Sequence, residues 1–155
     1  MTSPRPGSGN GAIVGSITGL PRIQIVRNPA TSKEVMLARG ELGNITQLSL
    51  AHHPRGESCG LHEHADMDEI FLVWEGEGII EVDGVQHIVS RGDFAALPIG
   101  VPHNLISTSA DFQVICIGIR ARGFAHLDDD VHDRKLPWHR SLKTQRSPWY
   151  QGLRW

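Results

Sequence analysis

The sequence predicts an all-β domain, and three observations lead to this prediction. Short apolar runs recur from residue 21 onward at spacings of about eight to twelve residues. Turn-forming residues separate these runs, in keeping with 17 glycines and nine prolines in a chain of 155 residues. The periodicity of an amphipathic helix is missing from the same region. Together these features favour a β-sandwich or a β-barrel.

The predicted strands follow the order of the apolar runs. They are residues 23–27, 35–38, 45–51, 60–64, 69–74, 78–82, 85–90, 94–97, 103–108 and 112–121. The clearest local signal is Asp83-Gly84, because both residues can adopt the positive φ angles of a type I′ turn. This turn predicts a hairpin between 79–82 and 85–89, and Leu97-Pro98-Ile99-Gly100 predicts a further turn.

Segments of different composition flank the predicted barrel, residues 21–121. Residues 1–20 contain five glycines and two prolines and predict a flexible lead-in. Residues 122–155 predict a C-terminal arm that packs on the barrel or on a second subunit, because its tryptophans, Trp138, Trp149 and Trp155, favour burial. A partly disordered tail is the alternative for this segment.

The composition of the chain excludes some kinds of binding partner and some cellular locations. A net charge of −2 argues against nucleic acid as a partner. No stretch has the length of a membrane span or the apolar core of a signal peptide, which predicts a cytoplasmic protein without a membrane partner. Cys59 and Cys116 are too few for a disulfide scaffold, and Cys116 lies in an apolar run as an expected buried thiol.

Side chains of the types that bind metals lie close together in the sequence. Residues i and i+2 of a strand share a face, so we expect His62 and His64 to point the same way. Glu69 on the next strand can face the same interior, and His103 begins a later strand as a fourth candidate. Imidazoles and a carboxylate suit a divalent first-row metal, and four protein ligands leave room for substrate on a five- or six-coordinate ion.

Strand alternation also predicts the walls of a substrate cavity. With Glu69 and His103 facing inward, the predicted substrate-binding residues are Phe71, Val73, Leu105 and Ser107. For residues 45–51, either Gln47, Ser49 and Ala51 or Thr46, Leu48 and Leu50 could face the cavity. His52 and His53 are expected in a surface turn, with the barrel mouth as the alternative. Few cations stand among these positions, which favours a small, partly apolar organic substrate.

The spacing of the candidate ligands resembles the two motifs of the cupin superfamily. In the first motif, five residues separate Gly56 from His62-x-His64, four more precede Glu69, and six more precede Gly76. In the second motif, five residues separate Gly92 from Pro98-x-Gly100, and two more precede His103. One position departs from the family pattern, since Ser107 stands where the second motif usually has asparagine.

The resemblance covers about residues 35–121 and implies a double-stranded β-helix, the jelly-roll barrel, with the metal inside. It implies that His62, His64, Glu69 and His103 bind one divalent transition metal ion per chain. Fe(II) is the first choice, and Mn, Ni, Cu and Zn are the alternatives, because the same ligands accept all of them. It also implies a homodimer.

The fold does not fix the activity, so three functions stay open. The favoured function is a dioxygenase-type oxidoreductase that acts on a small, partly apolar organic molecule, with Glu69 as the catalytic base if it leaves the metal. The second is a non-redox isomerase, epimerase or lyase, in which the metal polarises a carbonyl and Glu69, His52 or His53 is the base. The third is a non-catalytic metabolite-binding module. The lack of a separate acid and base pair favours the first.

Overall fold

The computed structural model describes residues 8–9 and 12–120, and the regular structure in this part of the chain is β-strand. The predicted C-terminal arm, residues 122–155, lies outside the described residues. The strands are β1 (Ser8–Gly9), β2 (Ala12–Ile13), β3 (Arg22–Ile25), β4 (Asn28–Leu37), β5 (Ile45–Pro54), β6 (Met67–Glu75), β7 (Glu77–Val82), β8 (Val85–Ser90), β9 (Phe94–Leu97), β10 (His103–Ser107) and β11 (Asp111–Arg120).

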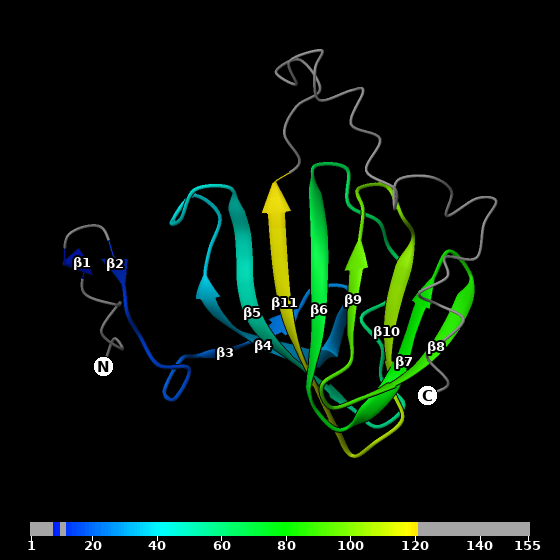
Figure 1. Ribbon diagram of the computed structural model, residues 1–155. Coiled ribbons are helices and arrows are strands. Elements are labelled where there is room, and N and C mark those ends of the chain that lie inside the picture. Colours follow the sequence, from blue (N-terminus) through cyan, green and yellow to red (C-terminus); the bar gives the residue numbers. More distant parts are fainter. Residues whose placement is uncertain (1–7, 10–11, 121–155) are drawn as a thin grey trace, which may run out of the picture. The chain divides into compact units, whose positions relative to one another are not determined.

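The strands form two antiparallel sheets and a short pair (Figure 1). The larger sheet has the order β3-β4-β5-β11-β6-β9, and the smaller has the order β10-β7-β8. β1 pairs with β2. Non-consecutive neighbours such as β5 and β11, or β10 and β7, belong to the jelly-roll arrangement, so the predicted fold class is confirmed.

The central strand β11 sets the rows of side chains that face the interior. It pairs with β5 on one side and β6 on the other, so that Cys116 stands between Ser49 and Phe71. Two residues further on, Gly118 stands between Gln47 and Glu69. The residues of each such row share one face of the sheet.

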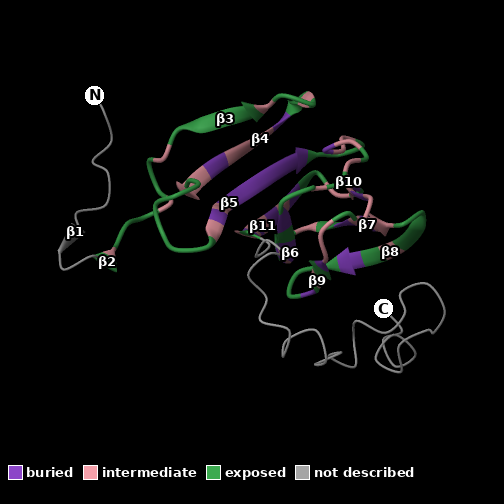
Figure 2. Cartoon of the chain, turned by 90° about the horizontal axis from the view of Figure 1, so that it is seen from above, coloured by how far each residue is buried: buried purple, intermediate pink, exposed green. Residues whose placement is uncertain are grey.

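Buried residues concentrate on β5, β6 and β11, whereas β3 and β8 are mostly exposed (Figure 2). The core between the sheets contains Phe71, Val73, Ile80, Leu105, Phe112 and Val114, each at most 2% exposed. The ring of Phe112 packs directly on the backbone of Gly78 in β7, where an added Cβ would lie 2.5 Å from the Phe112 ring. This close approach joins the larger sheet to the smaller one.

One predicted strand is wrong, those at 85–90 and 94–97 coincide with β8 and β9 at both ends, and the others are present with shifted ends. Residues 60–64 form an irregular segment that carries a single bridge, between His62 and His103. Gly60 has a φ of +83°, and the carbonyl of His64 accepts a hydrogen bond from the amide of Gly100, so this backbone leaves the ladder. The predicted hairpin is confirmed, with φ angles of 49° at Asp83 and 77° at Gly84.

Among the described residues, no helix has the length and apolar character needed to cross a membrane. The predicted homodimer and the cytoplasmic location stay predictions.

The packing of Phe112 gives the first testable prediction. Phe112→Ala should lower the free energy of unfolding by about 3–5 kcal/mol, because the change empties the contact between the sheets. Phe94→Ala is the matched control, since Phe94 is 71% exposed, and it should cost less than about 1 kcal/mol. Urea unfolding followed by circular dichroism measures both values. Should Phe112→Ala fail to fold, Phe112→Leu should still cost more than Phe94→Ala. Equal costs at the two positions would contradict this packing.

Candidate metal centre

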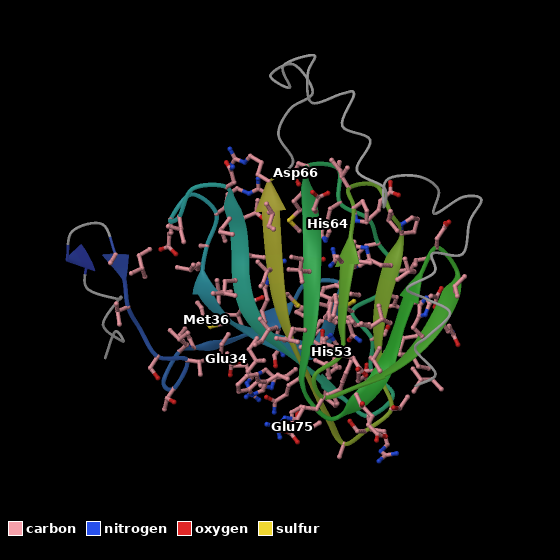
Figure 3. The ribbon with its side chains drawn as sticks, in the orientation of Figure 1. Glu34, Met36, His53, His64, Asp66 and Glu75 are labelled. Carbon is pink, nitrogen blue, oxygen red and sulfur yellow. The ribbon has the colours of Figure 1, made fainter. Side chains whose placement is uncertain are left out.

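Four side chains with metal-binding atoms converge inside the barrel. Each of His62, His64, Glu69 and His103 offers one ligand atom, and these atoms lie within 4.8 Å of one another. His62 and His64 come from the segment between β5 and β6, Glu69 comes from β6, and His103 begins β10. His64 lies toward the upper end of β6 in the view of Figure 3. The structure thus brings together the four residues that the sequence predicted as ligands.

Backbone hydrogen bonds position three of these residues. The amide of His62 donates to the carbonyl of His103 at 3.0 Å, and the amide of His103 donates to the carbonyl of His62 at 2.8 Å. His64 is held by its carbonyl, which accepts from the amide of Gly100 at 2.8 Å. The imidazole centroids of the three histidines consequently lie only 4.4–5.3 Å apart. Convergence of the rings does not require the strand that the sequence predicted for residues 60–64.

Two of the imidazoles have their tautomer fixed by a carbonyl two residues earlier in the chain. Nδ1 of His62 lies 2.7 Å from the carbonyl oxygen of Gly60, and Nδ1 of His103 lies 2.8 Å from that of Val101. Because a carbonyl only accepts, each Nδ1 carries the proton and donates. Each Nε2 is therefore left with a free lone pair, which is the form of histidine that binds a metal.

The carboxylate of Glu69 is held between the histidines and an amide. Its Oε2 lies 2.9 Å from Nε2 of His64 and 3.2 Å from Nε2 of His103, while its Oε1 accepts a hydrogen bond from Nε2 of Gln47 at 2.7 Å. Burial raises the pKa of Glu69, but the contacts with His103 and His64 outweigh this effect and lower the pKa to about 2. Glu69 is ionised at neutral pH, as a metal ligand must be.

The protonation of His62 suits the same role. Burial lowers its pKa to about 4, and the positive charge of Arg27 acts in the same direction, as would a proton on His103 or His64. The hydrogen bond to Gly60 opposes them without reversing the shift. His62 is consequently a neutral imidazole at pH 7, with its Nε2 lone pair available.

A buried nitrogen of His103 that lacks a hydrogen-bond partner indicates whether these residues fit a metal ion. Nε2 of His103 is buried and has no hydrogen-bond partner among the described residues; with the proton on Nδ1, its 3.2 Å approach to Oε2 of Glu69 brings two acceptors together. A buried polar atom without a partner is costly, whereas a cation among the four ligand atoms would accept this lone pair. Three imidazoles and one carboxylate are a donor set for a divalent first-row ion. The site therefore fits a divalent metal.

Sequence reasoning did not assign the side chains that support Glu69. Gln47 donates to Glu69, and Nζ of Lys33 donates to Oε1 of Gln47 at 3.2 Å. Gly118 lies beside Gln47 in the sheet, and a Cβ there would lie 2.2 Å from Oγ1 of Thr46, 2.8 Å from Sδ of Met67 and 3.1 Å from Cγ of Gln47. The sequence signal was weak because both faces of β5 carry buried residues, so alternation did not reveal which face points inward.

A cavity of about 60 Å³ adjoins the cluster and reaches His62 and Glu69. Phe71 and Leu105 line it, as the sequence predicted, although their role in substrate binding stays a prediction. Val73 and Ser107 do not border the cavity. Val73 belongs to the core, and the hydroxyl of Ser107 donates to the carbonyl of Ser109.

One face of β5 supplies much of the remaining wall, through Gln47, Ser49, Ala51 and His53. His52 and His53 lie within β5 and are 8% and 0% exposed, so the expected surface turn is wrong at both positions. His52 points to the other face and contacts Glu34 (Figure 3 labels Glu34 and His53).

Cations and thiols complete the cavity lining. Arg27 and Lys33 line it, so the inference that few cations surround the substrate is corrected. The sequence missed both because they lie on β4 and on the turn before it, where no metal-ligand spacing marks them. Cys59 and Cys116 are also at the wall, and burial raises the pKa of both thiols. They are protonated at neutral pH and are poor nucleophiles.

Comparison with known protein sequences gives one family and two relatives. Residues 49–118 match the family model described as "Cupin domain". Quercetin 2,3-dioxygenase of Bacillus subtilis is 31% identical over 70 residues, which cover 45% of this chain and 21% of that protein. Uncharacterized protein MJ1618 of Methanocaldococcus jannaschii is 25% identical over 79 residues, which cover 50% and 62%. The chain spans less than two thirds of the length of each of these curated relatives.

Solved structures share the fold at lower identity. A predicted oxalate decarboxylase from Thermotoga maritima has a TM-score of 0.65 and 22% identity, with 70% of this chain and 100% of that chain covered. A sugar phosphate isomerase of the cupin superfamily from Silicibacter pomeroyi has a TM-score of 0.59 and 21% identity, with 68% and 74% covered. These likenesses show the fold alone.

The buried imidazole of His53 predicts a pH dependence of stability. Burial lowers its pKa to about 4 in the folded protein, against about 6.5 in the unfolded chain. The unfolded state therefore binds more protons between these values, and stability should fall as the pH drops from 6.5 to 4. The expected contribution of His53 is about 3 kcal/mol by pH 4.

His53→Leu removes this contribution, so the metal-free variant should lose less stability between pH 7 and pH 4 than the metal-free native chain. Urea unfolding at several pH values measures the difference. His62 titrates in the same range but is common to both proteins. Identical pH profiles for the variant and the native chain would show that His53 is not buried in its neutral form.

Proposed function

This chain is a small protein with a cupin domain, and we propose that it is a metal-dependent oxidoreductase of the dioxygenase type. It binds one divalent transition metal ion through His62, His64, Glu69 and His103, with Fe(II) as the first choice. The observation that carries this proposal is the pair of Nε2 lone pairs that two carbonyls orient toward an ionised carboxylate. When bound, the metal supplies the one-electron chemistry that lets an organic molecule react with dioxygen.

The acid–base character of the cavity supports oxygen chemistry over isomerisation. A general base works best when its pKa lies near the working pH. Glu69 has a pKa of about 2 and accepts hydrogen bonds from His64 and Gln47, so it is a better ligand than base. His53 has a pKa of about 4, and His52 faces Glu34 instead of the cavity. Among the described cavity residues, therefore, none is a strong base, and an isomerase or lyase would need one.

The match to quercetin 2,3-dioxygenase supports the type of reaction but not the substrate. That relative is 31% identical to this chain over 70 residues. The cavity here, however, measures about 60 Å³, far below the roughly 300–1,000 Å³ of pockets for drug-sized ligands. A flavonoid such as quercetin is too large for it, so we infer a small organic substrate. Ile25, Ala51, Phe71 and Leu105 form the apolar part of the wall.

The ligand assignment predicts a graded loss of metal affinity. His62→Ala should abolish stoichiometric metal binding, because it removes a ligand. Gln47→Leu should weaken it about 10–100-fold, because it leaves Oε1 of Glu69 without its hydrogen bond. The controls are His87→Ala and Gln86→Leu, which lie on β8, away from the cluster. Elemental analysis and competition with a chelator measure both effects, and circular dichroism checks the fold. One metal ion per chain retained in His62→Ala would overturn the assignment.

The proposed chemistry predicts oxygen uptake. Protein purified without a tag should contain near-stoichiometric Fe, Mn, Ni or Cu, and should consume dioxygen when supplied with some member of a panel of small organic molecules. An oxygen electrode measures uptake, and His62→Ala protein is the control. Zinc as the native metal, or turnover of a substrate without oxygen consumption, would overturn the oxidoreductase proposal in favour of the isomerase or lyase. Absence of metal after reconstitution would overturn the metal site itself.

A further inference from the structure

Two cations border the cavity and lack a carboxylate partner. Nε of Arg27 donates to the carbonyl of Cys59 at 3.3 Å, and Nζ of Lys33 donates to Gln47 at 3.2 Å. Neither forms an ion pair with an acidic residue in the part of the chain that the structure describes. Glu69 is the acidic residue at the described cavity wall, and it is already engaged by Gln47 and the histidines. The cationic groups of Arg27 and Lys33 therefore remain available to a ligand.

The backbone holds these cations at the wall. The turn between β3 and β4 is fastened by Asn28, whose side-chain amide donates at 2.9 Å to a carboxylate oxygen of Glu57 and to the carbonyl of Ser58. Arg27 precedes Asn28 and is fixed with it. Lys33 stands beside Ala51 in the register of β4 and β5, yet its Nζ reaches Gln47. Its side chain therefore runs along β5 past Ser49, which lies between those two residues.

The charge in the loaded cavity is unbalanced. A divalent ion together with Arg27 and Lys33 brings four positive charges, against one negative charge on Glu69. Like charges that share a partly buried space repel one another, and an anion that enters it relieves the repulsion. Arginine and lysine are also the side chains that form charge-assisted hydrogen bonds with carboxylates.

The inner wall offers neutral polar groups that lack partners. Oγ of Ser49 and both ring nitrogens of His53 make no hydrogen bond to the described residues, and these residues are 1% and 0% exposed. Both line the same cavity as the cations. Buried polar groups are usually satisfied, so the wall is suited to a ligand that carries a hydroxyl or carbonyl group.

We propose that the cavity binds a small carboxylic acid with a second polar group, the carboxylate facing Arg27 and Lys33 and the second group hydrogen-bonding to Ser49. The proposal rests on the proposed function and names the substrate class of the same site. Since a water molecule needs about 10–15 Å³, a cavity of about 60 Å³ holds roughly five non-hydrogen atoms. That size corresponds to a 2-hydroxy or 2-keto acid of two or three carbons.

The experiment is isothermal titration calorimetry on the metal-loaded chain. The probes are glycolate and acetate, with ethylene glycol and acetamide as neutral counterparts of similar size. Glycolate should bind most tightly, and each acid should bind at least about tenfold more tightly than its neutral counterpart. Inorganic phosphate is titrated in parallel. Phosphate binding tighter than glycolate would overturn the carboxylate assignment, as would equal affinities for acids and neutral probes.

Single substitutions test which residues are responsible for glycolate binding. Arg27→Gln and Lys33→Met should each weaken glycolate binding about tenfold, whereas Ser49→Ala should reduce the preference for glycolate over acetate. Arg91→Gln is the control, because Arg91 lies in an exposed turn after β8. Unchanged glycolate affinity in both Arg27→Gln and Lys33→Met would overturn the proposal.

Measurement of metal content separates this proposal from the metal assignment on which it rests. Variants with full metal content and unchanged glycolate affinity would refute the carboxylate site alone. A native chain that takes up no metal would refute the proposed function. The cations predict the same preference for acids in that metal-free chain, so the titration still decides the carboxylate site.

Discussion

The site depends on the reciprocal backbone hydrogen bonds between His62 and His103. They join an irregular segment before β6 to the first residue of β10. The two histidines are 41 residues apart in the sequence, and these bonds fix the distance between their backbones. The side chains then need only local carbonyls, from Gly60 and Val101, to orient their rings. A regular strand at residues 60–64 would have pointed His62 and His64 to one face, but the fold achieves the convergence through this single bridge.

A chain of hydrogen-bonded side chains supports Glu69 from the side away from the histidines. Glu69 is buried and ionised, so each of its oxygens needs a donor or a cation. Nε2 of Gln47 donates a hydrogen bond to Oε1 of Glu69, and Nζ of Lys33 donates one to Oε1 of Gln47. A side chain at Gly118 would therefore force Thr46 and Met67 to shift and would press on Gln47, which holds Glu69.

The sequence predicted an all-β domain and the candidate ligands from local patterns, and the resemblance to the two cupin motifs added the jelly roll. The spacing of His62, His64 and Glu69, and the turn at Asp83-Gly84, are local and leave clear signals. The support for Glu69 depends on pairing between β4, β5 and β11, whose order comes from the whole fold. Alternation failed on β5 since both of its faces are covered, and it failed for Ser107 since the strand ends there and the hydroxyl turns to Ser109.

Arg27 connects the protonation of the site to the charge of what enters it. Burial is the main reason why His62 has a low pKa, and the positive charge of Arg27 adds to that effect. The guanidinium therefore favours the neutral imidazole that a metal requires, although it also opposes the approach of a cation. An anionic ligand beside Arg27 would offset that repulsion, so metal and anion should bind with positive coupling. The excess positive charge at the cavity thus links the two proposals, because a bound metal would add to a charge that an anion would offset.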